Sequence, residues 1–134
     1  MHALASLARN LGNASSLLAG VVQLQRDASK LLQIHDVLCL WIDWPRRIAY
    51  GANGRVGPEV EDLVTEIAGA GRGAFVSGAL VEPLGPPPAR AVLALRKRSG
   101  SSFTEQERTI IRTLAAGLAP AFDRVLAADR GGAI

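Results

Sequence analysis

The most reactive side chains of the sequence lie in one short stretch. His35 and Asp36 precede Cys39, and a histidine close to a cysteine can activate the thiol for nucleophilic attack. The same three residue types can bind metal ions, but their spacing here matches no recognised set of ligands. Cys39 also lies inside the apolar run 37–42, as a small buried hydrophobe does. We therefore expect no catalytic residue, no metal site and no cofactor, and keep a cysteine-dependent enzyme as the weaker alternative.

Five other side chains are candidates for binding a small molecule. Aromatic rings provide apolar walls for a ligand pocket, and a few polar groups orient the ligand. The segment 51–80 is short and leaves little chain to cover a large ligand, so a pocket here is expected to be small and apolar. The candidate lining residues are Trp41, Trp44, Tyr50, Phe75 and Ser77.

Two basic clusters could attract a nucleic acid. Arg46, Arg47 and Arg55 surround one predicted hairpin, and the segment 96–98 reads Arg-Lys-Arg. Neither cluster lies on a helix shaped to enter a groove of DNA. We interpret both as solvated hairpin ends and expect no nucleic-acid partner. The glycine-rich run 69–73 precedes a predicted strand instead of following one, so we interpret it as a helix stop and not as a phosphate-binding loop.

Length and composition indicate one folded domain. The chain has 134 residues, of which 49% are hydrophobic and 20% are charged, as is typical of a globular protein with a real core. The single cysteine excludes an internal disulfide and fits a reducing cytoplasm. No apolar run is long enough to span a bilayer, and the first residues lack the basic segment of a signal peptide. We therefore expect a cytoplasmic protein without membrane insertion.

The helices are predicted from apolar residues that recur every three or four positions. The last of them begins with a capping box, in which Thr104 and Glu107 satisfy each other's backbone amides. In chain order, the expected segments are a helix or arm at 1–13, helices at 14–34, 58–68 and 104–128, and a frayed tail at 130–134.

The strands are predicted from short apolar runs bounded by glycine, proline or charged residues. They cover residues 37–44, 46–50, 74–77 and 90–96, and residues 80–84 form either a further strand or the continuation of 74–77 past Gly78. The run 91–95 is apolar on both faces and must be covered on both. The fold class is therefore α+β, with a central antiparallel sheet and the helices 14–34 and 104–128 on the same face.

Three short motifs in a fixed order carry a family resemblance over nearly the whole chain. They are Pro83-Leu84 before a hairpin loop, Val92-Leu93-Ala94-Leu95, and Phe103-Thr104 followed by Glu107 and Leu114-Ala115 at the entry to the last helix. In these motifs the sequence resembles a GAF domain, the small sensory module of bacterial signalling proteins. The resemblance implies one domain over residues 1–134, with the first and last helices on one face of the sheet and a ligand pocket on the other.

The chain departs from that family in three respects. Residues 51–80 hold only one short helix and one strand, so the part that normally covers the pocket is shortened. The asparagine–lysine and phenylalanine–aspartate–glutamate residues of cyclic-nucleotide-binding GAF domains are absent, and Phe75 is followed by Val76. The chromophore-attaching cysteine of phytochrome-like members has no counterpart, because Cys39 lies in the first predicted strand.

The apolar faces of the two long helices are wider than one sheet face can cover. Their apolar residues alternate in steps of four and three, which is the repeat of a packed helical seam, and an uncovered apolar patch promotes association. We therefore expect a homodimer joined through both helices in a bundle. Its predicted interface residues are Leu17, Val21, Leu24, Ala28, Leu31, Ile111, Leu114, Leu118 and Val125.

These observations favour a non-enzymatic sensory or regulatory module. It is expected to act through dimerisation and through contacts with a signalling-protein partner. The alternative is a small-molecule sensor that uses the apolar pocket described above. The sequence names neither the signal nor the output.

Overall fold

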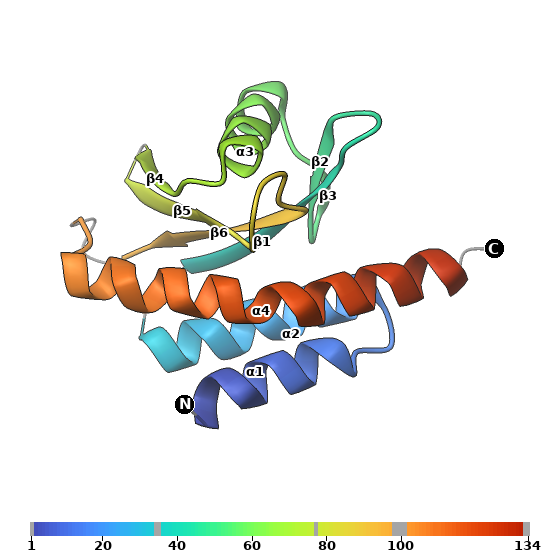
Figure 1. The fold of residues 1–134 in the computed structure, drawn as a ribbon, viewed down its shortest axis with the longest axis horizontal. Helices are drawn as coiled ribbons and strands as arrows, with labels where there is room; N and C mark the ends of the chain where they lie inside the picture. Colours follow the sequence, from blue (N-terminus) through green and yellow to red (C-terminus); the bar gives the residue numbers. More distant parts are fainter. Residues whose placement is uncertain (1, 34–35, 77, 98–101, 133–134) are drawn as a thin grey trace.

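The computed structural model describes residues 2–33, 36–76, 78–97 and 102–132. In chain order its elements are α1 (His2–Gly12), α2 (Leu17–Leu32), β1 (Asp36–Asp43), β2 (Ile48–Gly51), β3 (Gly54–Arg55), α3 (Pro58–Ala70), β4 (Ala74–Val76), β5 (Ala79–Pro83), β6 (Ala91–Arg96) and α4 (Glu105–Gly132). Figure 1 shows α3 on one face of the sheet, α2 and α4 on the other, and α1 outside these two. The predicted α+β architecture is therefore confirmed.

The sheet has six antiparallel strands in the order β3-β2-β1-β6-β5-β4. Its two middle strands pair from Asp36 opposite Arg96 to Trp41 opposite Ala91. Side chains of β6 point alternately to the two faces. Leu93 is buried beneath the long helices, and Val92 is buried beneath α3. The expectation that this strand needs cover on both faces is thus confirmed.

Capping residues set the starts of the two long helices. The Ser16 side chain accepts a hydrogen bond of 3.1 Å from the Ala19 amide, so α2 begins three residues later than the sequence suggested. The predicted capping box of α4 is present. The Thr104 amide donates to Glu107 at 2.8 Å, and the Glu107 amide donates to the Thr104 hydroxyl at 3.1 Å.

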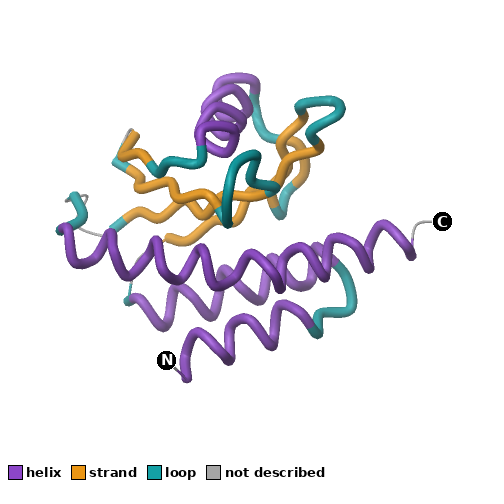
Figure 2. The backbone as a smooth tube through the Cα atoms, in the orientation of Figure 1, coloured by secondary structure: helices purple, strands orange, loops and turns teal. Residues whose placement is uncertain are grey.

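The N-terminal segment, expected to be a helix or an arm, is the helix α1. It packs on both α2 and α4 (Figure 2), with Leu7 and Leu11 buried in the contact. Gly20 permits the close approach, because a Cβ at this position would lie only 3.0 Å from the Ala14 Cβ and 3.1 Å from Leu11 Cδ1. Part of the surplus apolar surface of the long helices is therefore covered by α1.

The C-terminal segment is more ordered than the sequence suggested. α4 continues through Gly132, so residues 130–132 of the expected frayed tail are helical. Residues 133–134 lie outside the described part of the chain.

Candidate functional site

A groove of about 430 Å³ lies beside α4, where α3 ends and β4 begins. Its walls come from the connection between α3 and β4, the end of β5, the loop that follows β5, and one side of α4. The lining residues are Gly71, Arg72, Gly73, Glu82, Pro83, Gly85, Pro86, Arg112 and Ala116. Its volume falls within the range of small-molecule sites, and its lining includes three charged side chains.

Glu82 is the buried polar residue of this groove. It lies opposite Leu93 in the sheet, on the face that carries α4, and only 2% of it is exposed. Its Oε1 atom has no hydrogen-bond partner among the described residues. A buried carboxylate oxygen without a partner costs stability, so it calls for a physical explanation.

Gly73 provides the space that the carboxylate occupies. It lies just before β4, beside Glu82 of β5. A Cβ added at Gly73 would overlap the Glu82 carboxylate. The glycine is therefore needed for the side chain of Glu82 to lie where it does.

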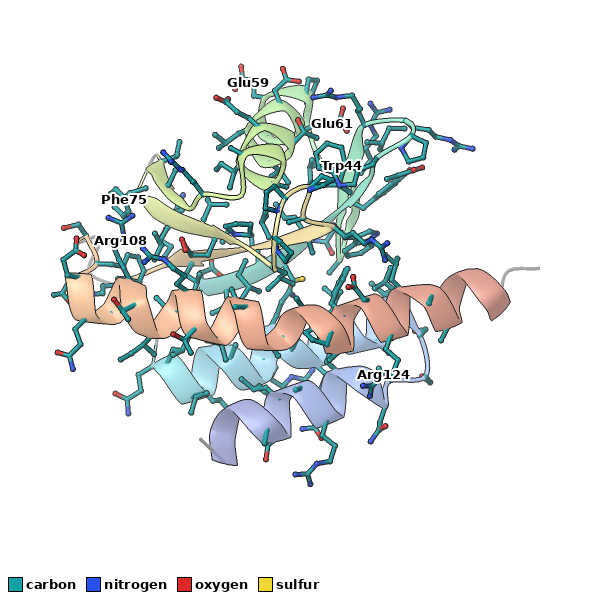
Figure 3. The ribbon with its side chains drawn as sticks, in the orientation of Figure 1. Trp44, Glu59, Glu61, Phe75, Arg108 and Arg124 are labelled. Atoms are coloured by element: carbon teal, nitrogen blue, oxygen red, sulfur yellow. The ribbon has the colours of Figure 1, made fainter. Side chains whose placement is uncertain are left out.

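Two arginines of α4 face the same carboxylate. Arg112 Nε is 3.9 Å from Glu82 Oε2, with 62% of the arginine side chain exposed, so this ion pair is too long to be a hydrogen bond. Arg108 lies one turn earlier, and its buried Nε has no acceptor among the described residues. Figure 3 places Arg108 near the start of α4, at the end of the molecule that carries β4. Burial raises the pKa of Glu82, and the two positive charges only partly oppose that rise.

The Glu82→Gln variant is expected to be more stable than the wild type at neutral pH. A carboxyl whose pKa is higher in the folded than in the unfolded protein favours folding while protonated. That advantage is lost as the pH rises through the folded-state pKa. Glutamine cannot ionise, so the variant avoids the cost of a buried charge, about 1 kcal/mol or more. Urea denaturation should give the two proteins similar free energies of unfolding near pH 4, and a lower value for the wild type by pH 8. The difference should appear only as the pH rises, because the pKa of Glu82 is raised in the folded protein.

Two other carboxylates also make stability depend on pH, so the effect of Glu82 is measured as the difference between wild type and variant. Hydrogen bonds from Arg55 and from Lys97 lower the pKa of Glu61 and of Glu107, respectively, so both groups lose stabilising contacts as the pH falls. This loss is common to wild type and variant and cancels in their difference. The exposed residue Glu66 provides the control, since Glu66→Gln should not alter the pH dependence. Parallel curves for wild type and Glu82→Gln would contradict the placement of this side chain.

Cys39 is buried in the sheet and unsuited to nucleophilic chemistry. Burial raises the pKa of its thiol to about 12, so the reactive thiolate is scarce at neutral pH. Its backbone amide donates a 3.0 Å hydrogen bond to Gln25 Oε1, which ties β1 to α2. His35, the proposed activating residue, lies outside the described part of the chain.

Among the described residues, no three His, Cys, Asp or Glu side chains come together in a way that could hold a metal ion. Among the same residues, no helix combines the length and the apolar character needed to cross a bilayer.

Comparison of the structure with solved structures finds a close match in fold. The GAF domain of an Acinetobacter phosphoenolpyruvate-protein phosphotransferase superposes with a TM-score of 0.67, over 94% of this chain and 93% of that one, at 13% sequence identity. The chain has a GAF-like fold. No protein-family model matches the sequence, and no curated protein is significantly similar to it.

The GAF resemblance implied a ligand pocket on the sheet face opposite the long helices. In this chain α3 covers that face, and its apolar residues form a second core with β1, β2, β5 and β6. Val64, Ile67 and Ala68 of α3 are buried there. The groove beside α4 lies instead next to the face that carries the long helices.

The structure distributes the predicted pocket residues over three places. Trp41 and Tyr50 stack on the face of the long helices, with ring centroids 6.2 Å apart. Trp44 belongs to the core under α3, where its indole N–H donates to the Ala89 carbonyl at 2.8 Å. Phe75 lies in β4 at the far edge of the sheet and is 44% exposed. Figure 3 shows this separation of Trp44 from Phe75, and Ser77 lies outside the described residues.

The predicted dimer-interface residues lie mostly inside the protomer. Leu31 is 43% exposed, whereas the others are buried in the core shared by the sheet, α1, α2 and α4. These buried members are Leu17, Val21, Leu24, Ala28, Ile111, Leu114, Leu118 and Val125. A second copy has no access to them in the folded protein.

The basic clusters have acidic or aromatic neighbours. Arg55 forms a two-pronged contact with Glu61, at 3.1 and 3.2 Å, which also links β3 to α3. Lys97 contacts Glu107 at 2.7 Å. Arg47 lies over the Trp44 ring at 6.0 Å. These contacts agree with the interpretation of the clusters as hairpin ends.

Sequence reasoning missed the groove and its polar residues. One local signal was available, since Glu82 is the only charged residue in the apolar run 80–84. A charge in such a run indicates either an exposed strand or a buried group with a role. The glycine-rich run was correctly interpreted as a helix stop, because Gly71 caps α3 with a φ of 70° and a 3.0 Å bond to the Ile67 carbonyl.

Proposed function

We propose that the chain is a non-enzymatic sensory or regulatory module of bacterial signal transduction, acting in the cytoplasm through contacts with a second copy or a signalling partner. The GAF-like fold, matched over 94% of the chain, carries this proposal. The matched domain comes from a phosphoenolpyruvate-protein phosphotransferase, which supports a role as one part of a larger protein or assembly. The high pKa of the Cys39 thiol, about 12, argues against the cysteine-dependent enzyme.

Self-association through the helical face rests on apolar side chains that α1 leaves uncovered. Leu18 and Val22 lie one turn apart on one side of α2 and are 50% and 37% exposed. Ile110, near the start of α4, is 51% exposed. Exposed apolar groups of this size on long helices are common in interfaces between protein chains.

The Leu18→Glu variant is expected to convert a dimeric wild type to monomers. A charge at this position is solvated in the monomer and desolvated in a helical interface, where it weakens binding by several kcal/mol, on the order of 2–4. Light scattering at micromolar concentration measures the change. The control is Val60→Glu on α3, which is 43% exposed on the opposite side of the sheet. A monomeric wild type would refute self-association.

Small-molecule sensing in the groove beside α4 is the second candidate function. It is favoured by the buried Glu82 Oε1 atom, which lacks a hydrogen-bond partner among the described residues and lines the groove. Native mass spectrometry of protein purified without added ligand separates the two functions. Dimer mass alone supports regulation by protein contacts, and a retained small mass supports sensing.

A further inference from the structure

The groove beside α4 has an unpaired acceptor and more positive than negative charge. Glu82 Oε1 is buried without a partner among the described residues. Arg72 and Arg112 line the groove together with this single carboxylate. Arg112 lies 3.9 Å from the second carboxylate oxygen, so its guanidinium remains available for another acceptor. The groove therefore has one acceptor to satisfy and two guanidinium groups to balance one negative charge.

These charges exclude the simplest ligands. A plain cation would satisfy the Glu82 acceptor but would be repelled by Arg72 and Arg112. A plain anion would pair with the arginines but would leave the buried oxygen unsatisfied and add a second negative charge beside it. A ligand that has both a donor and an anionic group meets both requirements.

We propose that the groove binds a small carboxylate that also carries an N–H or O–H donor, an amino acid or a hydroxy acid. The donor binds Glu82 Oε1, and the carboxylate binds the guanidinium groups of Arg112 and Arg72. This inference rests on the proposed small-molecule sensing and names the ligand class of that site.

The walls of the groove fit a compact polar ligand. Gly71, Gly73 and Gly85 contribute no side chains, and Pro83 and Pro86 contribute no amide donors. Charged side chains therefore dominate the polar recognition. The volume of about 430 Å³ lies in the lower part of the range found for small-molecule sites.

Binding of three matched four-carbon dicarboxylates by the full chain tests the proposal. Malate carries a hydroxyl at the second carbon, aspartate carries an ammonium there, and succinate carries neither. We expect malate or aspartate to bind at least about tenfold more tightly than succinate, because a site that lacks its expected donor keeps an unpaired polar group. Isothermal titration calorimetry or amide chemical shifts measure the affinities, with ethylammonium as the donor that has no carboxylate.

Three variants assign the contacts. Glu82→Met keeps a side chain of similar length but removes the acceptor, so the preference over succinate should disappear. Glu82→Gln keeps a neutral acceptor and should weaken aspartate more than malate, which separates amino acids from hydroxy acids. Arg112→Gln lies on the helix surface and should weaken all dicarboxylates about tenfold. The exposed Arg26 of α2 provides the matched control, since Arg26→Gln should change nothing.

Each outcome decides the proposal. A donor-dependent preference that is lost in Glu82→Met, with affinity reduced in Arg112→Gln, supports it. If Glu82→Met does not fold, the wild-type preference and Arg112→Gln suffice. Equal binding of succinate and malate that still depends on Arg112 overturns the ligand class and leaves sensing in the groove intact. No binding of any probe at millimolar concentration, or tighter binding of ethylammonium, overturns the ligand class, while a small mass retained in native spectra would still support sensing.

Discussion

Replacing Leu93 with aspartate is expected to abolish folding. Leu93 is fully buried in the middle of the sheet, between Cys39 and Glu82 on the neighbouring strands. The substitution places a charge under the long helices, beside a carboxylate that already lacks a hydrogen-bond partner. An uncompensated buried charge costs more than about 4 kcal/mol, which approaches the whole stability of a domain, about 5–15 kcal/mol.

Circular dichroism on heating measures this effect. The variant should have no cooperative transition, whereas the wild type should have one. Leu38→Asp is the matched control, because Leu38 lies in β1 and is 45% exposed. The control protein should fold and melt cooperatively. A wild-type melt for Leu93→Asp would contradict the position of β6 at the centre of the core.

The Phe122→Ala variant is expected to fold with greatly reduced stability. Among the described residues Phe122 is the largest fully buried side chain, 1% exposed, and packs in the core between α4 and the sheet. Truncation leaves a cavity that the neighbouring helices can only partly close. Such changes cost about 3–5 kcal/mol, which should appear in urea denaturation as a lower midpoint with an unchanged slope.

A second truncation on the same helix isolates the role of burial. Ile110→Ala removes an apolar side chain that is 51% exposed, so its cost should stay below about 1 kcal/mol. If the two variants were equally stable, α4 would have to present a different face to the sheet.

The elements of the fold were predictable because their signals are local. The alternation of apolar residues along α2 and α4 identified two amphipathic helices, and the Thr104–Glu107 pair located the start of the last one. The strand at Gly54–Arg55 was missed, because two residues beside a glycine turn carry no periodicity. The start of α2 was placed too early, because Asn13 and Ser16 are both good capping residues.

The spacing of the apolar residues in a helix did not predict which segment covers them. The spacing of Leu17, Val21 and Leu24 correctly indicated that this face is buried. A second copy and other segments of the same chain satisfy that requirement equally well, and in the structure the sheet, α1 and α4 supply the cover. The first 13 residues did not clearly predict a helix that packs on the others, since only Leu4, Leu7 and Leu11 mark an apolar side.

The groove was hidden from the sequence for a different reason. Its lining residues extend from Gly71 to Ala116 and come from four segments. Only the tertiary fold brings Arg112 to Glu82, and no local pattern records a contact across 30 residues of chain. The pocket was predicted at aromatic residues instead, because aromatic rings commonly line ligand pockets. In the structure Trp44 is part of the core under α3.

The contact between Gly73 and Glu82 also restricts how this chain can diverge. Substitutions at the two positions must occur in a fixed order. Glu82 can be replaced by an apolar residue while Gly73 remains, because removing the carboxylate creates no overlap with the glycine. A side chain at 73 cannot be accepted while the carboxylate stays in its present place, since the two would overlap. Loss of the acid therefore opens position 73 to substitution, whereas any descendant that keeps the buried acid inherits the glycine with it.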